Sequence, residues 1–480
     1  MPKCLNGEIP IMKLSYKKTI LVGFAFFLIS AFWQAYDAIV PMILTNHFGM
    51  SQSVSGVIMS LDNILAVFML PLFGALSDRT ETRMGRRKPF VLFGTIAAII
   101  SFVTLTLVDN YQLARVKLSS IPSDMAAVES DTEGISSVWA KTMEITLENP
   151  LPLIVFVGAL LVVLIAMAVF RSPAVALMPD VTVKPLRSKG NAIINLMGAA
   201  GGVIVLALGI VFKTSENKYM EYTAYVLCVC AVMALGFILF MALVKERKWA
   251  REMEEESRRL GIDELPEPAT QDKKGVKLGK PQLRSLFLIL ASVALWYIGY
   301  NSITSKYSVY ASTVLNIDYN MTLIIAQAAA IVSYIPVGLV ASKIGRKRTI
   351  LGGVVMLGSA FFIGNFISPG MSGVIMYPVF ALAGIGWATI NVNSFPMVVE
   401  LARSGDTGKY TGYYYTASMS AQIVAPILSG FLYDINMRVF FFLFATVFVG
   451  ASFVTMLFVK HGDSKPEKQG ALESLGVDDD

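Results

Sequence analysis

Long apolar segments alternate with short polar ones along the chain, from about residue 18 to about residue 459. A helix needs about 20 apolar residues to cross the hydrocarbon core of a bilayer. Measured against this length, the apolar segments predict an all-α membrane protein with twelve transmembrane helices, at residues 18–44, 53–76, 90–109, 151–178, 189–212, 222–244, 284–311, 321–341, 350–368, 373–397, 412–434 and 438–459.

Basic residues occur in alternate loops, and this asymmetry predicts the orientation of the helices. Loops that stay in the cytoplasm are enriched in Lys and Arg. The loops 45–52, 312–320 and 369–372 contain neither residue, whereas the loop after residue 76 contains the dense basic segment from Arg79 to Lys88. We therefore predict that both chain termini lie in the cytoplasm, in a multi-pass protein of a bacterial cell membrane.

The dense basic segment occurs twice. Residues 74–89 read GALSDRTETRMGRRKP, and a shorter copy, GLVASKIGRKR, occupies residues 338–348. A repeat at half-chain spacing predicts two bundles of the same orientation, as in a rocking transporter. The predicted organisation is a cytoplasmic N-terminus (1–17), a first six-helix bundle (18–244) with an outer-side polar insert (110–150) that forms a small helix or lid, a cytoplasmic linker (245–283), a second six-helix bundle (284–459) and a disordered cytoplasmic tail (460–480).

The predicted linker begins with a charged, helix-forming run at residues 245–256. Trp249, Met253 and Leu260 give this run a thin apolar stripe, which is compatible with a helix lying on the membrane surface. A plain solvated helix explains the composition equally well, and the sequence favours neither.

The composition excludes several classes of function. Hydrophobic residues make up 55% of the chain and charged residues 15%, and the net charge of +6 comes from loop cations that set topology, so nucleic-acid binding is not expected. Three cysteines are too few for a disulfide framework. The sequence contains no phosphate-binding Gly-Lys-Ser/Thr loop, no His-Glu-x-x-His and no Gly-x-Ser-x-Gly. We therefore expect no enzyme activity, no cofactor and no metal site, and a transport function driven by a gradient rather than by ATP.

Polar side chains inside the apolar segments are the candidate functional residues, because each is costly in hydrocarbon unless it faces a cavity or a partner. Aromatic rings can pack on the apolar face of a sugar while amides and charged groups bind its hydroxyl groups. The sequence therefore predicts a sugar-binding cavity formed by Trp33, Gln34, Asp37, Asn63, Arg171, Tyr300, Asn301, Lys306, Asn391 and Gln422.

Several motifs resemble known transporters. The two basic segments resemble the loop signature of the major facilitator superfamily. Residues 173–179, PAVALMP, are similar to helix four of the glycoside–pentoside–hexuronide:cation symporters, and a Pro followed seven residues later by Asp180 resembles the sucrose–proton symporters. Segments 384–400 and 422–430 resemble helices ten and eleven of the same group. The resemblance covers both halves of the chain and implies the major facilitator fold with a sugar as cargo.

The departures from this group concern the coupling ion. Arg171 stands where melibiose-type permeases have a sugar-binding aspartate, and Ala66 and Leu70 stand near the positions of their sodium-site aspartates. A sodium site needs several oxygen ligands, whereas one carboxylate is enough to bind a proton. We therefore predict proton coupling, although Asp180 could instead anchor the neighbouring basic loop. Ranked by resemblance and surroundings, the predicted proton carriers are Asp180, Asp37 and Asp62.

Gate salt bridges are expected at the cytoplasmic helix ends, from Asp78, Arg79, Arg86, Arg87, Arg346 and Glu400. The resulting hypothesis is a monomeric proton symporter that imports an oligosaccharide or glycoside by alternating access in the lipid bilayer. Two alternatives stay open: an exporter or carrier of another organic solute, and a non-transporting nutrient sensor. The amides of the predicted cavity argue against an exporter of amphiphiles, and the short linker argues against a sensor.

Overall fold

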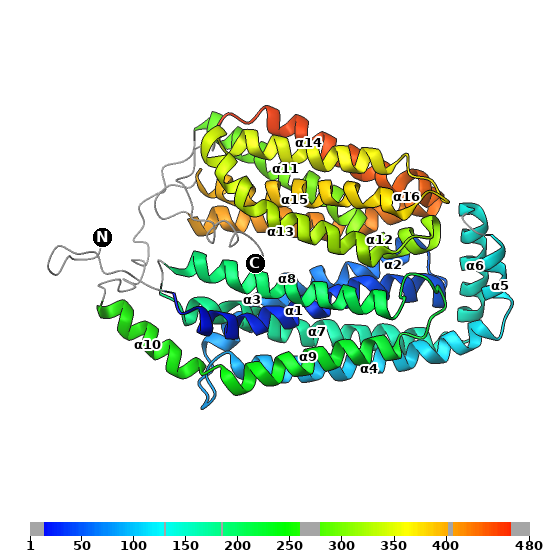
Figure 1. The fold of residues 1–480 in the computed structure, drawn as a ribbon, viewed down its shortest axis with the longest axis horizontal. Coiled ribbons are helices and arrows are strands. Elements are labelled where there is room, and N and C mark those ends of the chain that lie inside the picture. Colours follow the sequence, from blue (N-terminus) through cyan, green and yellow to red (C-terminus); the bar gives the residue numbers. More distant parts are fainter. Residues whose placement is uncertain (1–13, 129–130, 184–185, 260–278, 402–406, 462–480) are drawn as a thin grey trace.

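The computed structural model describes residues 14–128, 131–183, 186–259, 279–401 and 407–461. The regular structure of this part of the chain is helical (Figure 1). Its elements are α1 (Tyr16–Met42), the π-helix η1 (Ile43–His47), α2 (Gln52–Met59), α3 (Leu61–Asp78), α4 (Lys88–Lys117), α5 (Ile121–Ala127), α6 (Thr132–Glu148), α7 (Leu151–Asp180), α8 (Arg187–Val211), α9 (Thr223–Leu243), α10 (Glu246–Arg259), α11 (Lys280–Thr304), α12 (Tyr307–Val309), the π-helix η3 (Tyr310–Leu315), α13 (Tyr319–Ile344), α14 (Arg346–Gly364), the 3-10 helix η4 (Gly373–Ile375), α15 (Met376–Val399) and α16 (Thr407–Leu457).

Eleven helices in the described ranges are long and apolar enough to cross a membrane. The last of them, residues 409–457, has 49 residues and would be about 74 Å long if straight, more than twice the hydrocarbon thickness. Its backbone leaves the helical conformation at Asn436, with φ −160° and ψ 100°, and the chain turns back there (Figure 1). The two parts cover the predicted helices 412–434 and 438–459, while the total of twelve and the orientation stay predictions.

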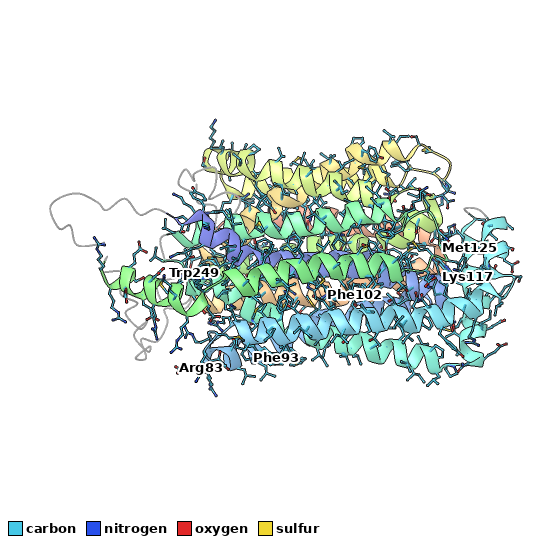
Figure 2. All side chains as sticks on the ribbon, turned by 60° about the horizontal axis from the view of Figure 1, so that its bottom comes forward. Arg83, Phe93, Phe102, Lys117, Met125 and Trp249 are labelled. Carbon is cyan, nitrogen blue, oxygen red and sulfur yellow. The ribbon has the colours of Figure 1, made fainter. Side chains whose placement is uncertain are left out.

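The helices bury one face and leave the other apolar and exposed, as a bilayer requires. Phe93 and Phe102 lie on opposite sides of α4, because nine residues correspond to two and a half helical turns. Phe93 is 68% exposed and points outward in Figure 2, whereas Phe102 is 1% exposed and packs in the core. Close helix approach depends on small residues: a Cβ at Gly94 of α4 would lie 2.9 Å from the Ala166 carbonyl oxygen of α7.

We use "first half" for the described residues before 260 and "second half" for those after 278. In Figure 1 the first-half helices α1, α3, α4, α7, α8 and α9 form the lower part of the bundle, and α11, α13, α14, α15 and α16 form the upper part. Within the halves, α4 packs on α7, α1 on α8 and α9, and α11 on α16. Between them, α13 contacts α8 and α16 contacts α2.

The predicted insert at residues 110–150 comprises the last turns of α4, which ends at Lys117 rather than 109, followed by α5 and α6. These two helices lie across one end of the bundle, which we call the insert end (Figure 1). Trp139 of α6 attaches them to η1, since its Nε1 donates to Asn46 Oδ1 over 3.0 Å. The opposite end, with the loop at 79–87 and α10, is called the basic end.

Orientation can be tested with single cysteines at exposed positions of the two ends. We expect cysteines replacing Glu81 and Lys343, at the basic end, to be protected in intact cells from a thiol reagent that cannot cross membranes. A cysteine replacing Ser137, exposed on α6, should react. Permeabilised cells, in which all three positions should react, provide the control. Labelling of the basic-end positions in intact cells would reverse the predicted orientation.

Candidate solute cavity and its surrounding networks

Two adjoining pockets of about 450 and 510 Å³ lie between the halves and form one two-lobed cavity. The lobes share residues from both halves, and each half therefore contributes to the same wall. The shared residues are Gln34, Asp37, Arg171, Tyr300, Gln327, Ala330 and Tyr334.

A stacked aromatic pair lines the second lobe. The ring of Trp387, from α15, lies parallel to that of Tyr300, from α11, with centroids 3.6 Å apart and an interplanar angle of 3°. Tyr297 meets the same indole edge-on at 5.1 Å. Sequence reasoning found Tyr300 but missed Trp387, because one Trp in an apolar helix is equally typical of packing or of the membrane interface.

Four of the five amides predicted for the cavity lie in its wall. Gln34, Asn63, Asn301 and Gln422 all line the cavity, and Gln34 is shared by both lobes. Gln327, which sequence reasoning missed, has a buried Oε1 atom with no hydrogen-bond partner among the described residues.

Trp33 lines the first lobe, and its buried Nε1 atom likewise has no hydrogen-bond partner in the described part of the chain. Buried polar atoms are nearly always hydrogen-bonded. A bound solute with hydroxyl groups would satisfy both the indole donor and the Gln327 acceptor.

Three charged groups meet beside this wall. Asp37 and Arg171 line both lobes, and Asp62 is near enough to each for their charges to interact. Asn63 Nδ2 donates to Asp62 Oδ1 over 2.9 Å, which orients that carboxylate. The structure therefore brings Asp37, Asp62 and Arg171 together, while their roles in binding solute and proton stay predictions.

Two predicted cavity residues lie elsewhere. Lys306 is fully buried between the halves and donates to the Ser55 hydroxyl of α2, so it belongs to a contact between halves rather than to the cavity wall. Asn391 is 5% exposed within α15, where this helix packs on α13 and α14. Both corrections have the same cause: a polar residue in an apolar helix can face a neighbouring helix as well as a cavity.

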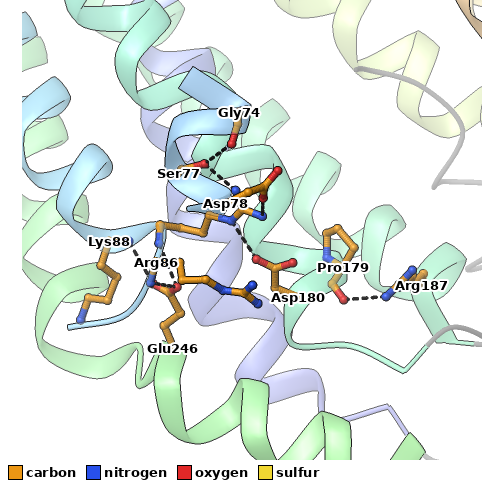
Figure 3. A network of polar contacts seen from close by, with 10 residues as sticks. Gly74, Ser77, Asp78, Arg86, Lys88, Pro179, Asp180, Arg187 and Glu246 are labelled. Carbon is orange, nitrogen blue, oxygen red and sulfur yellow. Dashed lines mark hydrogen bonds and ion pairs between the residues drawn. The ribbon is translucent and has the colours of Figure 1, made fainter. Parts of the chain in front are cut away.

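The basic end has its own ion-pair network, in which Arg87 pairs with the carboxylates of Asp78 and Asp180, both labelled in Figure 3. Arg87 Nη2 lies 2.5 Å from Asp78 Oδ1, and its Nε donates to Asp180 Oδ2 over 2.8 Å. Burial opposes the charge of Arg87, but the two carboxylates outweigh this effect and raise the pKa of the guanidinium. Asp180, ranked first as proton carrier from the sequence, thus anchors the basic loop, which is the alternative interpretation that the sequence left open.

The other predicted gate residues are also found at this end. Arg346 Nε donates to Glu400 over 2.6 Å within the second half. Arg79 is exposed, and Arg86 contacts the first residue of α10 through its backbone amide. The ion pairs described here join residues of the same half, so their role in gating stays a prediction.

Glu246, the first residue of α10, was missed by the sequence analysis. Its carboxylate accepts backbone N–H bonds from Arg86, Arg87 and Lys88 at 2.6, 2.9 and 2.9 Å, at the start of α4 (Figure 3). A carboxylate satisfies the unpaired amides and the positive dipole end of a helix N-terminus. Gly85 has φ +123° directly beside this carboxylate, where any side chain would collide with it.

The linker helix α10 packs on the protein through Trp249, so this residue of the predicted apolar stripe is buried against the bundle. Trp249 is 8% exposed, and Lys18 of α1 lies 5.9 Å from its ring centroid. Lys18 Nζ also lies 2.5 Å from Glu252 Oε2, and this hydrogen bond lowers the pKa of Glu252. Leu260, the third residue of the stripe, lies outside the described residues.

These features define a polytopic helical membrane protein with a solute-sized polar cavity between two halves. Residues 22–425 match the family model of the Major Facilitator Superfamily, and a second match covers residues 321–477. The chain therefore belongs to this superfamily. It is a multi-pass transporter of the cell membrane, and the superfamily is not a class of enzymes.

Relatives of known sequence include other members of the superfamily. An uncharacterised transporter from Methanocaldococcus jannaschii is 24% identical over 457 residues, covering 92% of this chain and 95% of the relative. An isoprimeverose transporter from Lactiplantibacillus pentosus is 22% identical, over 76% of this chain and 67% of its own. A putative glycoside/cation symporter from Escherichia coli is 34% identical over 76 residues, which is 15% of this chain and 16% of the relative.

Solved structures share the fold. The xylose transporter of Escherichia coli in an inward-open conformation has a TM-score of 0.60 at 14% identity, with 96% of this chain and 99% of that chain covered. A bacterial homologue of the iron transporter ferroportin, inward-facing, has a TM-score of 0.62 at 13% identity, with 92% and 99% covered. These likenesses concern the fold alone.

The Glu246 contact can be tested by thermal unfolding of the purified protein in detergent. We expect Glu246→Ala to lower the free energy of unfolding by about 2 kcal/mol, because three backbone amides, two of them buried, lose their acceptor. Glu255→Ala, at an exposed position of the same helix, should change it by less than about 0.5 kcal/mol. Equal unfolding midpoints for the two variants would show that the cap does not stabilise the basic end.

Proposed function

We propose that this transporter is a proton-coupled symporter of an oligosaccharide or glycoside. One observation supports the sugar above all others: a stacked Tyr300–Trp387 pair in a cavity whose wall also contains several amides and the Asp37 carboxylate. A pyranose has an apolar face that packs against an aromatic ring and a rim of hydroxyl groups that both donate and accept hydrogen bonds. Gln34, Gln327 and Asn301 offer both kinds of partner.

The size of the cavity agrees with this class of solute. Its two lobes, of about 450 and 510 Å³, fall within the range of small-molecule sites and leave room for more than one sugar ring. Two relatives in the superfamily have names of the same kind, an isoprimeverose transporter and a putative glycoside/cation symporter. Their cargo supports the proposal by analogy.

Coupling is proposed to run through Asp37, with Asp62 as its partner. Asp37 lines both lobes, so its protonation would directly change its interaction with a bound solute. Repulsion between the two carboxylates would disfavour two negative charges in the group, while Arg171 would stabilise one of them. Asp180 becomes the third candidate because Arg87 already pairs with it.

The proposed function is tested with purified protein in liposomes. Uptake of a panel of labelled mono- and disaccharides and glycosides should be raised by an inward proton gradient. Separate arms with a sodium gradient, and with no gradient, identify the coupling ion. Transport of none of the sugars, with transport of another organic solute, would favour the alternative of a different cargo.

The aromatic pair gives a prediction on affinity. Trp387→Ala should weaken binding of the transported sugar about tenfold, because the sugar loses an aromatic ring on which its apolar face packs. Trp387→Phe keeps an aromatic ring and should retain most of the affinity. Phe366→Ala, at a residue 65% exposed on the outer surface of the bundle, is the matched control. Binding is measured by calorimetry in detergent. Unchanged sugar affinity in Trp387→Ala would show that the aromatic pair is not part of the sugar site.

A second prediction separates coupling from binding. In Asp37→Asn the group no longer changes charge, so accumulation driven by a pH gradient should be lost. Exchange of external for internal sugar should persist, since it does not need the proton to leave. Asp180→Asn should keep accumulation, although at a lower rate. Loss of accumulation in Asp180→Asn alone would instead identify Asp180 as the proton carrier, as the ranking from the sequence predicts.

A further inference from the structure

One set of contacts that joins the two halves at the insert end is made by helix α2 and the middle of α16. Gln52 and Ser53, the first residues of α2, donate their backbone amides to the two oxygens of Asp434, at 2.5 and 2.9 Å. Asp434 belongs to the second half and α2 to the first. The carboxylate of one half therefore caps a helix of the other.

Further contacts along α2 strengthen this junction. Lys306, fully buried in the second half, donates to the hydroxyl of Ser55 one turn into the helix. Ser60 Oγ donates to the Ile423 carbonyl oxygen over 3.0 Å. The helix surfaces are close, because a Cβ on Gly430 would lie 2.5 Å from the Gln52 carbonyl oxygen.

A second junction at the same end differs, because its carboxylate caps a helix of its own half. Asp318 of the second half caps its own helix, accepting from the Asn320 amide over 3.0 Å, and it also accepts from the Ser215 hydroxyl of the first half over 2.7 Å. Thr214 of the first half adds a hydroxyl that accepts from Tyr319 and from the Asn320 side chain, over 2.8 and 3.0 Å. Opening this junction would leave the α13 cap in place. Opening the junction at α2 would remove the Asp434 carboxylate, although Ser51 would remain as a weaker cap that reaches the Val54 amide over 3.3 Å.

We infer that Asp434, with α2 and Lys306, is the latch that holds the insert end closed and sets the equilibrium between closed and open forms. In the closed form the carboxylate satisfies two amides and stands at the positive end of the helix dipole. In the open form both the amides and the Lys306 ammonium must be satisfied by water. The latch thus stabilises the conformation whose cavity is shut off from the insert end.

Distances between spin labels test this inference without any assumption about the solute. The native cysteines are replaced by alanine, and one pair of labels is placed at Leu118 and Phe366 to report the insert end. A second pair at Glu81 and Lys343 reports the basic end. Both distances are measured in liposomes by double electron–electron resonance.

In Asp434→Asn we expect the ratio of open to closed forms at the insert end to rise about tenfold, with a shorter distance at the basic end, because the side chain loses its charge and one of its two acceptor oxygens. Asp131→Asn is the matched control, because Asp131 Oδ2 caps α6 within the first half, accepting from the Gly134 amide over 2.9 Å. Unchanged distributions in Asp434→Asn, or equal changes in both variants, would overturn the latch.

A steric variant examines the same junction without altering charge. Gly430→Ala adds a methyl group against the Gln52 carbonyl and should open the insert end in the same direction. Gly353→Ala is its control, since that Cβ would lie 2.9 Å from the Thr389 Cβ atom of the same half. A shift in Gly430→Ala alone supports the latch. No shift in Gly430→Ala would show that closure does not depend on this contact.

Discussion

The absence of water from the bilayer interior is the constraint on which this structure depends. Each unpaired polar group there costs several kcal/mol, so charges and helix ends must find partners within the protein. At the two ends of the bundle, the fold satisfies the first amides of its helices with carboxylates. Glu246 serves α4, Asp318 serves α13 and Asp434 serves α2. Each of these carboxylates also links its helix to a segment that is more distant in sequence. The same contact therefore satisfies backbone amides and holds two parts of the chain together.

The same constraint explains which parts of the fold can be predicted from the sequence. Runs of about 20 apolar residues have few structural solutions, so the positions of the long helices follow directly. The reversal at Asn436 was predicted as well, by the short polar interruption between residues 434 and 438. The extension of α4 to Lys117 was not, because a helix that leaves the membrane no longer needs an apolar sequence.

The cavity was harder to predict than the helices. Asp37, Arg171 and Asn301 were found because a polar residue in an apolar run requires a partner. The same reasoning misplaced Lys306, whose partner is the Ser55 hydroxyl and not a solute. Nothing in the sequence singles out Trp387 or Glu246 as functional. A tryptophan is common in apolar helices, and a glutamate is common in a charged linker. Their roles depend on neighbours that are distant in sequence.

The capping of α2 by Asp434 has a consequence for the synthesis of the protein. The donor amide of Gln52 and its acceptor are separated by 382 residues, so the helix is complete in sequence long before its cap exists. Until the ribosome has made the second half, the first turn of α2 must rely on Ser51 alone or on water. The first half is therefore made before the acceptor of these amides, and arrival of the final segments completes the cap of α2 as well as the bundle.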